Sequence, residues 1–188
     1  MNKKSIPDNS GFTHKSDLLA TFEGSPKSFE LSGPGTLLRL VQYSRLAQER
    51  VHPGRFWFDE ELMIRVKNRA RLELARQQRE DGRPFASPFG SLVMLYMRHV
   101  FRNDLAVSKD WTNDFDGYMR IRLLAGDKLT ALVGAAKRQP AYSVAHPRHE
   151  VVMAKNIWLE GQATQYVIDF NFPGNKPYVQ RIQGPFEF

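Results

Sequence analysis

The chain contains no cysteine among its 188 residues. Disulfide bonds are therefore excluded, as are zinc sites built on thiolates and any cysteine nucleophile. The five histidines show no spacing typical of metal ligands. His146 and His149 flank Pro147, and we expect both to be solvated loop residues. We therefore expect no bound metal.

Long apolar runs are also missing. No segment approaches the roughly 20 apolar residues that cross a membrane. The basic residues 1–4 are not followed by the apolar stretch of a secretory signal. We expect a protein without a membrane span that is made and kept in a cytoplasm. The common phosphate-loop, dinucleotide-fold, zinc-protease and serine-hydrolase motifs are absent too.

The composition suits a folded domain with an anionic partner. Hydrophobic residues make up 41% of the chain, which is enough for a sizeable core. The formal net charge is +7. Such a surplus favours nucleic acid, an anionic membrane, a dinucleotide or an acidic protein as a partner. The same charge can also serve solubility alone.

Glycine and proline positions suggest where the domain begins. Residues 1–33 are polar and interrupted by glycine and proline, which predicts an N-terminal tail that is flexible or loosely docked. Residues 34–188 are expected to form one domain.

Arg39 lies within the apolar, β-rich run of residues 36–43. This run predicts a buried strand, and a charged guanidinium there needs a partner because an unpaired buried charge is costly. A structural salt bridge and a clamp for an anion or phosphate both meet that need.

A helix is predicted after the aromatic strand at residues 55–58. Asp59 is a good N-cap, and Gly82 ends the pattern. The apolar face consists of Leu62, Val66, Ala70 and Leu74. The other faces carry six basic residues, namely Arg65, Lys67, Arg69, Arg71, Arg76 and Arg79. These six form the best candidate for a phosphate-facing surface.

The last third of the chain is rich in strand patterns. Residues 118–124 and 129–136 predict two strands joined by a hairpin turn at 125–128. Residues 164–172 and 178–182 predict two more. Residues 91–99 fit either a second helix or a buried strand. The order of elements predicts an α+β fold.

Two short motifs lie far apart along the chain. The early one consists of Pro34, Gly35, Thr36 and Arg39, and the late one of Gly161, Thr164, Gln165 and Tyr166. Their order resembles that of the ADP-ribosyltransferase-like superfamily of toxins. The closest likeness is to the NAD-glycohydrolase toxins, which carry a Gly-rich Thr-Gln-Tyr strand. The chain has Gln162 and Ala163 where that family has glycines.

The resemblance implies a split antiparallel β-sheet core with helices packed against it, and NAD as a substrate whose nicotinamide–ribose bond is cleaved. Arg39 would grip the pyrophosphate, since arginine makes bidentate phosphate contacts. Trp57 or Phe58 would stack on the nicotinamide. Gln165 or Glu160 would contact the ribose, with a glutamate favouring transfer to an acceptor and a glutamine favouring hydrolysis.

The resemblance also implies partners. These are a protein or nucleic-acid acceptor, an immunity protein, and a target cell into which a toxin or effector is delivered. The alternative from the residues alone is a non-catalytic basic module that binds nucleic acid or an acidic protein. In that case the arginine-rich helix of residues 59–81 is the binding surface.

Overall fold

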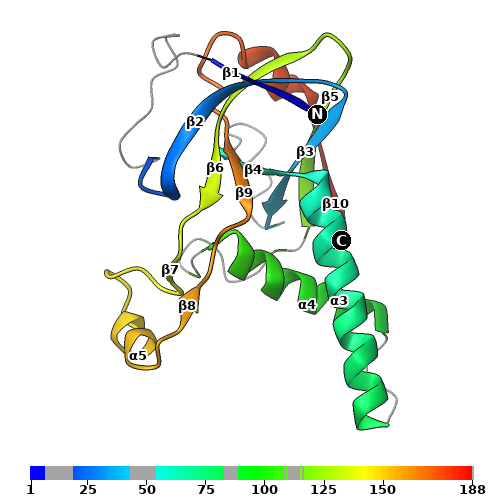
Figure 1. Cartoon of the computed structure of the whole chain (residues 1–188), viewed down its shortest axis with the longest axis vertical. Helices are drawn as coiled ribbons and strands as arrows, with labels where there is room; N and C mark the ends of the chain where they lie inside the picture. The colour runs from blue at the N-terminus through cyan, green and yellow to red at the C-terminus, as the bar shows by residue number, and fades with distance from the viewer. Residues whose placement is uncertain are drawn as a thin grey trace.

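A large antiparallel sheet with two long helices on one side forms the body of the protein (Figure 1). The computed structural model describes residues 1–6, 19–42, 54–82, 89–107, 109, 115 and 117–187. The sheet has eight strands in the order β1-β2-β6-β9-β4-β3-β5-β10. The α+β class predicted from the sequence is therefore confirmed.

Most of the sheet is built from strands distant in sequence. The strands are β1 (Asn2–Ser5), β2 (Phe22–Ser32), β3 (Gly35–Val41), β4 (Phe56–Asp59), β5 (Gly117–Leu123), β6 (Lys128–Ala136), β9 (Thr164–Val167) and β10 (Ile182–Glu187). The helices are α3 (Glu60–Asp81) and α4 (Phe89–Asp104). A smaller two-stranded sheet, β7 (Gln139–Pro140) and β8 (Trp158–Leu159), carries the short helix α5 (His149–Ala154).

Helix α3 follows the predicted pattern. The Asp59 side chain accepts a hydrogen bond from the Leu62 amide at 3.0 Å, so it caps the helix as expected. Gly82 takes the left-handed conformation that ends many helices. The four residues of the predicted apolar face are all buried. Residues 89–104, left open between helix and strand, form the helix α4.

The two faces of the sheet pack on different cores. On one face, Leu38 and Phe58 pack against buried residues of α3 and α4, including Val66 and Phe101. The other face holds a core of sheet residues together with Tyr178. Because successive side chains on a strand point to opposite faces, these cores assign each strand residue to one side.

The sheet curls around the second of these cores. Met1, which precedes the edge strand β1, lies so close to Gly35 of β3 that a Cβ at Gly35 would meet its side chain. In the sheet order these strands are five places apart. The Lys3 ammonium also lies 4.9 Å from the centre of the Tyr166 ring on β9. The first residues of the chain therefore help to enclose this core.

The prediction of a flexible or loosely docked N-terminal tail is wrong for the two segments that form β1 and β2. Strand β2 pairs with β6 from Phe22 opposite Ala136 to Ser32 opposite Lys128, and β1 pairs with β2. The segment resembled a tail because its buried positions, such as Leu31, are separated by polar residues that face outward. The part of the predicted tail at residues 7–18 lies outside the described residues.

Two further expectations need correction. A turn occurs at the predicted hairpin, where the Asp127 amide bonds to the Leu124 carbonyl at 3.1 Å. However, β5 and β6 do not pair; β5 lies between β3 and β10, and β6 lies between β2 and β9. Alternation sets which side chains are buried but not which strands become neighbours.

The predicted final strand is also displaced. Residues 176–181 form the short 3₁₀ helix η2 (Lys176–Arg181), and the strand β10 begins only at Ile182. Tyr178 is buried in η2, and its hydroxyl accepts from the Lys128 amide at 2.8 Å and donates to the Lys128 carbonyl at 3.0 Å. These tertiary hydrogen bonds favour the helical turn over the extended form.

Asn175 anchors this C-terminal segment to the sheet. Its side chain is fully buried. It accepts from the Thr130 amide at 2.9 Å and donates to the carbonyls of Thr130 and Asp169 at 2.8 and 3.0 Å. One amide side chain thus satisfies three backbone groups.

We predict that Asn175→Ala lowers the free energy of unfolding by about 3 kcal/mol, because it leaves buried backbone groups without partners. Urea unfolding followed by circular dichroism measures this change. Asn171→Ala is the matched control, since Asn171 is exposed. An equal effect of the two substitutions would contradict the role assigned to Asn175.

Candidate functional site

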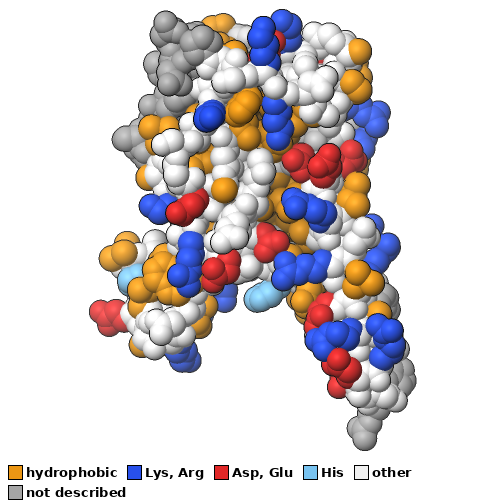
Figure 2. All heavy atoms as spheres, viewed as in Figure 1, with side chains coloured by type: hydrophobic (Ala, Val, Ile, Leu, Met, Phe, Trp, Pro, Cys, Tyr) orange, Lys and Arg blue, Asp and Glu red, His pale blue; other side chains and the backbone are white. Residues whose placement is uncertain are grey.

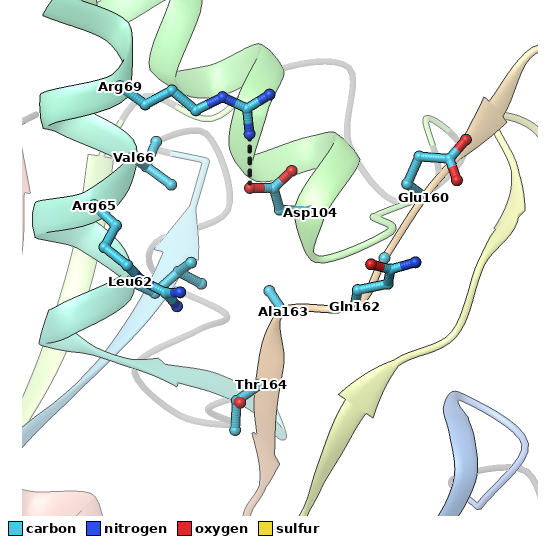
Figure 3. A pocket seen from close by; sticks show the side chains of 10 residues that line it. Leu62, Arg65, Val66, Arg69, Asp104, Glu160, Gln162, Ala163 and Thr164 are labelled. Carbon is cyan, nitrogen blue, oxygen red and sulfur yellow. Dashed lines mark ion pairs between the residues drawn. The ribbon is translucent and has the colours of Figure 1, made fainter.

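A groove of about 440 Å³ lies between helix α3 and the segment of residues 160–164 that leads into β9 (Figure 3). This volume falls in the range of small-molecule sites. The groove is lined by Leu62, Arg65, Val66, Arg69, Asp104, Glu160, Gly161, Gln162, Ala163 and Thr164. Four of these, from Gly161 to Thr164, lie within residues 161–166, the stretch that the late motif spans, and Gly161 and Thr164 belong to the motif itself.

The wall formed by α3 has an apolar floor and a cationic rim. Leu62 and Val66 are buried, whereas Arg65 and Arg69 are exposed. The two arginines are four residues apart, so they lie on the same face of the helix. The Arg69 guanidinium is 3.6 Å from the carboxylate of Asp104, the last residue of α4 (Figure 3).

The opposite wall is fixed to the end of α4. The amides of Gly161 and Ala163 donate to the carbonyls of Asn103 and Asp104 at 2.8 and 3.0 Å. The last carbonyls of a helix lack partners within the helix. Gly161 and Ala163 supply two of those partners, so the end of α4 sets the position of this wall.

Two successive residues of this wall adopt left-handed backbone conformations. Gly161 and Gln162 both have φ of 71°. A Cβ at Gly161 would collide with the Ala136 carbonyl. A left-handed conformation costs a non-glycine residue about 1–2 kcal/mol. Gln162 therefore occupies a backbone position that favours glycine.

Glu160 is the exposed carboxylate of the groove. It lies 3.4 Å from the Arg138 guanidinium, and both side chains are more than half exposed. Exposed ion pairs of this kind contribute little to stability. The carboxylate can therefore exchange Arg138 for another partner at small cost.

The structure does not bring Arg39 and Gln165 together. Arg39 lies on the same face of β3 as Leu37, which belongs to the core that also contains Tyr166. Gln165 precedes Tyr166 on β9, so its side chain points to the opposite face. Strand β4 lies between the two strands as well. The expected cleft between Arg39 and Gln165 is thus not formed.

Gln165 has a structural environment. It is 5% exposed, and its side-chain amide donates to the Thr21 carbonyl at 3.0 Å. This hydrogen bond ties the start of β2 to β9. Gln165 does not line the groove, whereas the neighbouring Thr164 does.

Trp57 and Phe58 are both core residues. Trp57 is 1% exposed and its indole donates to the Gly54 carbonyl at 2.9 Å. Phe58 is 2% exposed and packs on Phe101 in the other core. Neither ring is accessible for the stacking on nicotinamide that the resemblance implied.

Arg39 contacts the backbone at residues 54 and 56. Its guanidinium donates to the Phe56 carbonyl at 3.3 Å and lies so close to Gly54 that a Cβ would not fit there. The segment 43–53, which joins β3 to this region, lies outside the described residues. Among the residues of the groove, Arg65 and Arg69 are the cations available to an anion.

The basic residues of α3 are exposed, apart from the half-buried Lys67. They are mixed with acids, however. Arg76 bonds to both Glu73 and Glu80, and its hydrogen bond to Glu73 lowers the pKa of that carboxyl. Figure 2 shows blue and red side chains side by side along the lower part of α3. With six basic and five acidic residues, α3 carries a net charge of only +1.

Asp104 is the groove residue that the sequence did not point to. An acid at the C-terminal end of a helix is electrostatically unfavourable without a cation nearby. That unfavourable position is the one local signal that could have marked it. Its partner Arg69 lies on another helix, and local sequence does not show such a pairing.

Comparisons with protein-family models, curated proteins and solved structures gave no match. The site is therefore interpreted from its own geometry. Within the described residues, no group of three or more histidine and carboxylate side chains could hold a metal ion. None of the described helices is long and apolar enough to cross a membrane.

We predict that Gln165→Ala lowers the free energy of unfolding by about 1 kcal/mol, because the buried side chain loses its hydrogen bond to the Thr21 carbonyl, which keeps the Lys137 amide as a donor. Thermal unfolding measures the effect. Gln180→Ala is the control, since Gln180 is exposed. A variant as stable as the wild type would argue against a structural role for Gln165.

The two left-handed residues give a second, paired prediction. Gly161→Ala should lower the free energy of unfolding by roughly 2 kcal/mol or more, because the added Cβ meets a carbonyl in a strained conformation. Gln162→Gly should leave it unchanged or raise it by up to about 1 kcal/mol. Chemical denaturation compares the two. Similar losses in both variants would contradict the backbone geometry described for this wall.

Proposed function

We propose that the protein consumes NAD by cleaving its nicotinamide–ribose bond, and that the groove between α3 and residues 160–164 is the site. The observation that carries the proposal is that Glu160 and residues 161–164 line one groove together with two arginines of α3. The resemblance to NAD-glycohydrolase toxins supplies the reaction, and the groove supplies a place for it.

The sheet geometry supports the proposed ADP-ribosyltransferase-like fold. Strand β4 is only four residues long, and its two halves have different partners. Phe56 and Trp57 pair with β9, whereas Phe58 and Asp59 pair with β3. The sheet thus divides at β4, with helices packed on one side, as expected of a split-sheet core.

The chemistry of the groove residues fits the reaction. Arg65 and Arg69 are suited to the two phosphates of NAD, because guanidinium groups donate in pairs to phosphate oxygens. Cleavage of the nicotinamide–ribose bond develops positive charge on the ribose. A carboxylate near that charge stabilises the transition state, and Glu160 is the exposed carboxylate of the strand wall.

The residues proposed to bind NAD differ in part from those that the sequence predicted. Glu160 keeps its role at the ribose. Arg65 and Arg69 replace Arg39 as the phosphate ligands, and Gln165 becomes a positioning residue behind the wall. The nicotinamide is expected to lie on the apolar floor formed by Leu62 and Val66, where no aromatic ring is needed.

The test is to incubate the full chain with NAD and to follow nicotinamide release by chromatography. We expect the wild type to release nicotinamide, and Glu160→Gln to release it roughly 100-fold more slowly. Arg65→Ala should raise the KM for NAD about tenfold, through loss of a charge-assisted contact. Glu150→Gln and Arg71→Ala are matched controls, because both residues are exposed away from the groove.

A second measurement separates hydrolysis from transfer. The wild type is incubated with biotinylated NAD and a cell lysate, and labelled macromolecules are detected. Labelling of macromolecules by the wild type that is lost in Glu160→Gln would identify a transferase, and nicotinamide release without labelling would identify a hydrolase. If the wild type releases no nicotinamide with or without lysate, the proposal is wrong. Binding of labelled oligonucleotides that falls in Arg65→Ala would then favour the basic binding module.

A further inference from the structure

The segment from Lys137 to Glu160, called the lobe below, projects from the body of the protein. It leaves the end of β6, forms the strands β7 and β8 with the helix α5 between them, and returns to β9. Figure 1 shows α5 at the far end of this projection, and Figure 2 shows a notch between the lobe and α3. The lobe is therefore accessible from several sides.

The lobe has a small core of its own. This cluster comprises Ala106, Ala141, Tyr142, Val152 and Leu159. Two of the five are alanines, and the cluster is separate from the two cores of the sheet. The lobe thus has little room to bury further apolar side chains.

Several aliphatic side chains of the lobe remain in solvent. Val144 is 81% exposed, Val151 55% and Ile157 43%. They account for three of the eight large hydrophobic residues that are exposed in the described part of the chain. Single exposed apolar residues are ordinary, but these three lie within 14 positions of one small projecting segment.

The charges around these side chains are mainly positive. The lobe carries Lys137, Arg138, Arg148 and Lys155 against Glu150 and Glu160, a net charge of +2. One of the two acids, Glu160, already pairs with Arg138. The complement of this surface is therefore acidic.

Two of the cations, Arg138 and Arg148, contact aromatic side chains. The Arg138 guanidinium lies 4.9 Å from the centre of the Trp158 ring. Arg148 lies 3.5 Å from the Tyr142 hydroxyl, and the Tyr142 ring stacks on His146 at 4.4 Å. Contacts of this kind restrict long side chains before a partner arrives, which reduces the entropic cost of binding.

We propose that the lobe is a docking surface for an acidic partner protein, which places apolar side chains against Val144, Val151 and Ile157 and carboxylates against Arg138 and Arg148. The exposed apolar side chains, Val144, Val151 and Ile157, are aliphatic, which favours a protein over a nucleic acid as the partner. Single-stranded nucleic acid binds through exposed aromatic rings. The Tyr142 ring is 9% exposed and stacked on His146, and the half-buried Trp158 ring has the Arg138 guanidinium over it. The proposal does not depend on NAD turnover.

The test selects 12-residue peptides from a random phage-displayed library on the immobilised full chain at low salt. We expect the enriched peptides to combine aspartate or glutamate with large apolar residues. A synthetic peptide of the leading sequence should bind at least tenfold more weakly to the double variant Val144→Ser/Val151→Ser and to Arg148→Glu. Binding to the wild type should also weaken as salt rises, because exposed charges are screened.

The controls are Leu72→Ser and Arg79→Glu, which change an exposed aliphatic residue and an exposed arginine on α3. Thermal unfolding checks that every variant is folded. The proposal is overturned if no consensus is enriched, if the consensus is not acidic, or if the lobe variants bind the peptide as the controls do. Binding of a labelled single-stranded oligonucleotide that is lost only in the lobe variants would also overturn it, in favour of nucleic acid.

Discussion

The two oxygens of the Asp59 carboxylate connect the parts of the structure on which the groove depends. One oxygen accepts from the Leu62 amide and so begins helix α3. The other accepts from the Tyr166 hydroxyl at 2.9 Å. Burial, followed by the nearby Asp59 charge, raises the pKa of Tyr166 well above its ordinary value. The hydroxyl therefore stays protonated and remains a donor to Asp59.

This arrangement explains why the groove has a defined width. Asp59 ends β4 and pairs with Leu37 of β3, while Tyr166 belongs to β9, the strand that continues from the opposite wall. The start of α3 is thereby fixed to both neighbours of β4. Each wall also has a second anchor at α4, through Arg69 on one side and the amides of residues 161 and 163 on the other.

Features that depend on local sequence were predicted well. The cap at Asp59, the stop at Gly82 and the buried stripe of α3 each follow from the preferences of a few adjacent residues. The same holds for the existence of β3, β5 and β6, of which β5 shows a strict alternation of buried and less buried residues. The α+β class follows from these elements, whichever way they are connected.

Features that depend on pairing were not predictable in this way. Arg39 and Gln165 each fit a motif, but their relative orientation is set by the register of β3, β4 and β9. A shift of one residue in register reverses the face to which a side chain points. The polar outer face of β2 concealed a central strand for a related reason, since only its pairing with β6 shows that Leu31 lies inside.

The neighbouring residues Gly161 and Gln162 also differ in how far the sequence predicts their conformation. Gly161 is recognisable in the sequence because its φ and its contact with the Ala136 carbonyl both require glycine. Gln162 has the same φ without being a glycine, so the sequence there conceals the conformation.

The groove and the lobe meet at Arg138. Its guanidinium lies over Trp158 within the lobe and pairs with Glu160 at the groove. Because both members of that ion pair are largely exposed, the carboxylates of an acidic partner docked on the lobe would compete with Glu160 for Arg138. Glu160 would then be released toward the groove. The two proposed sites are thus joined by a single, readily exchanged contact, and occupancy of the lobe would change the charge environment of the groove without any movement of the backbone.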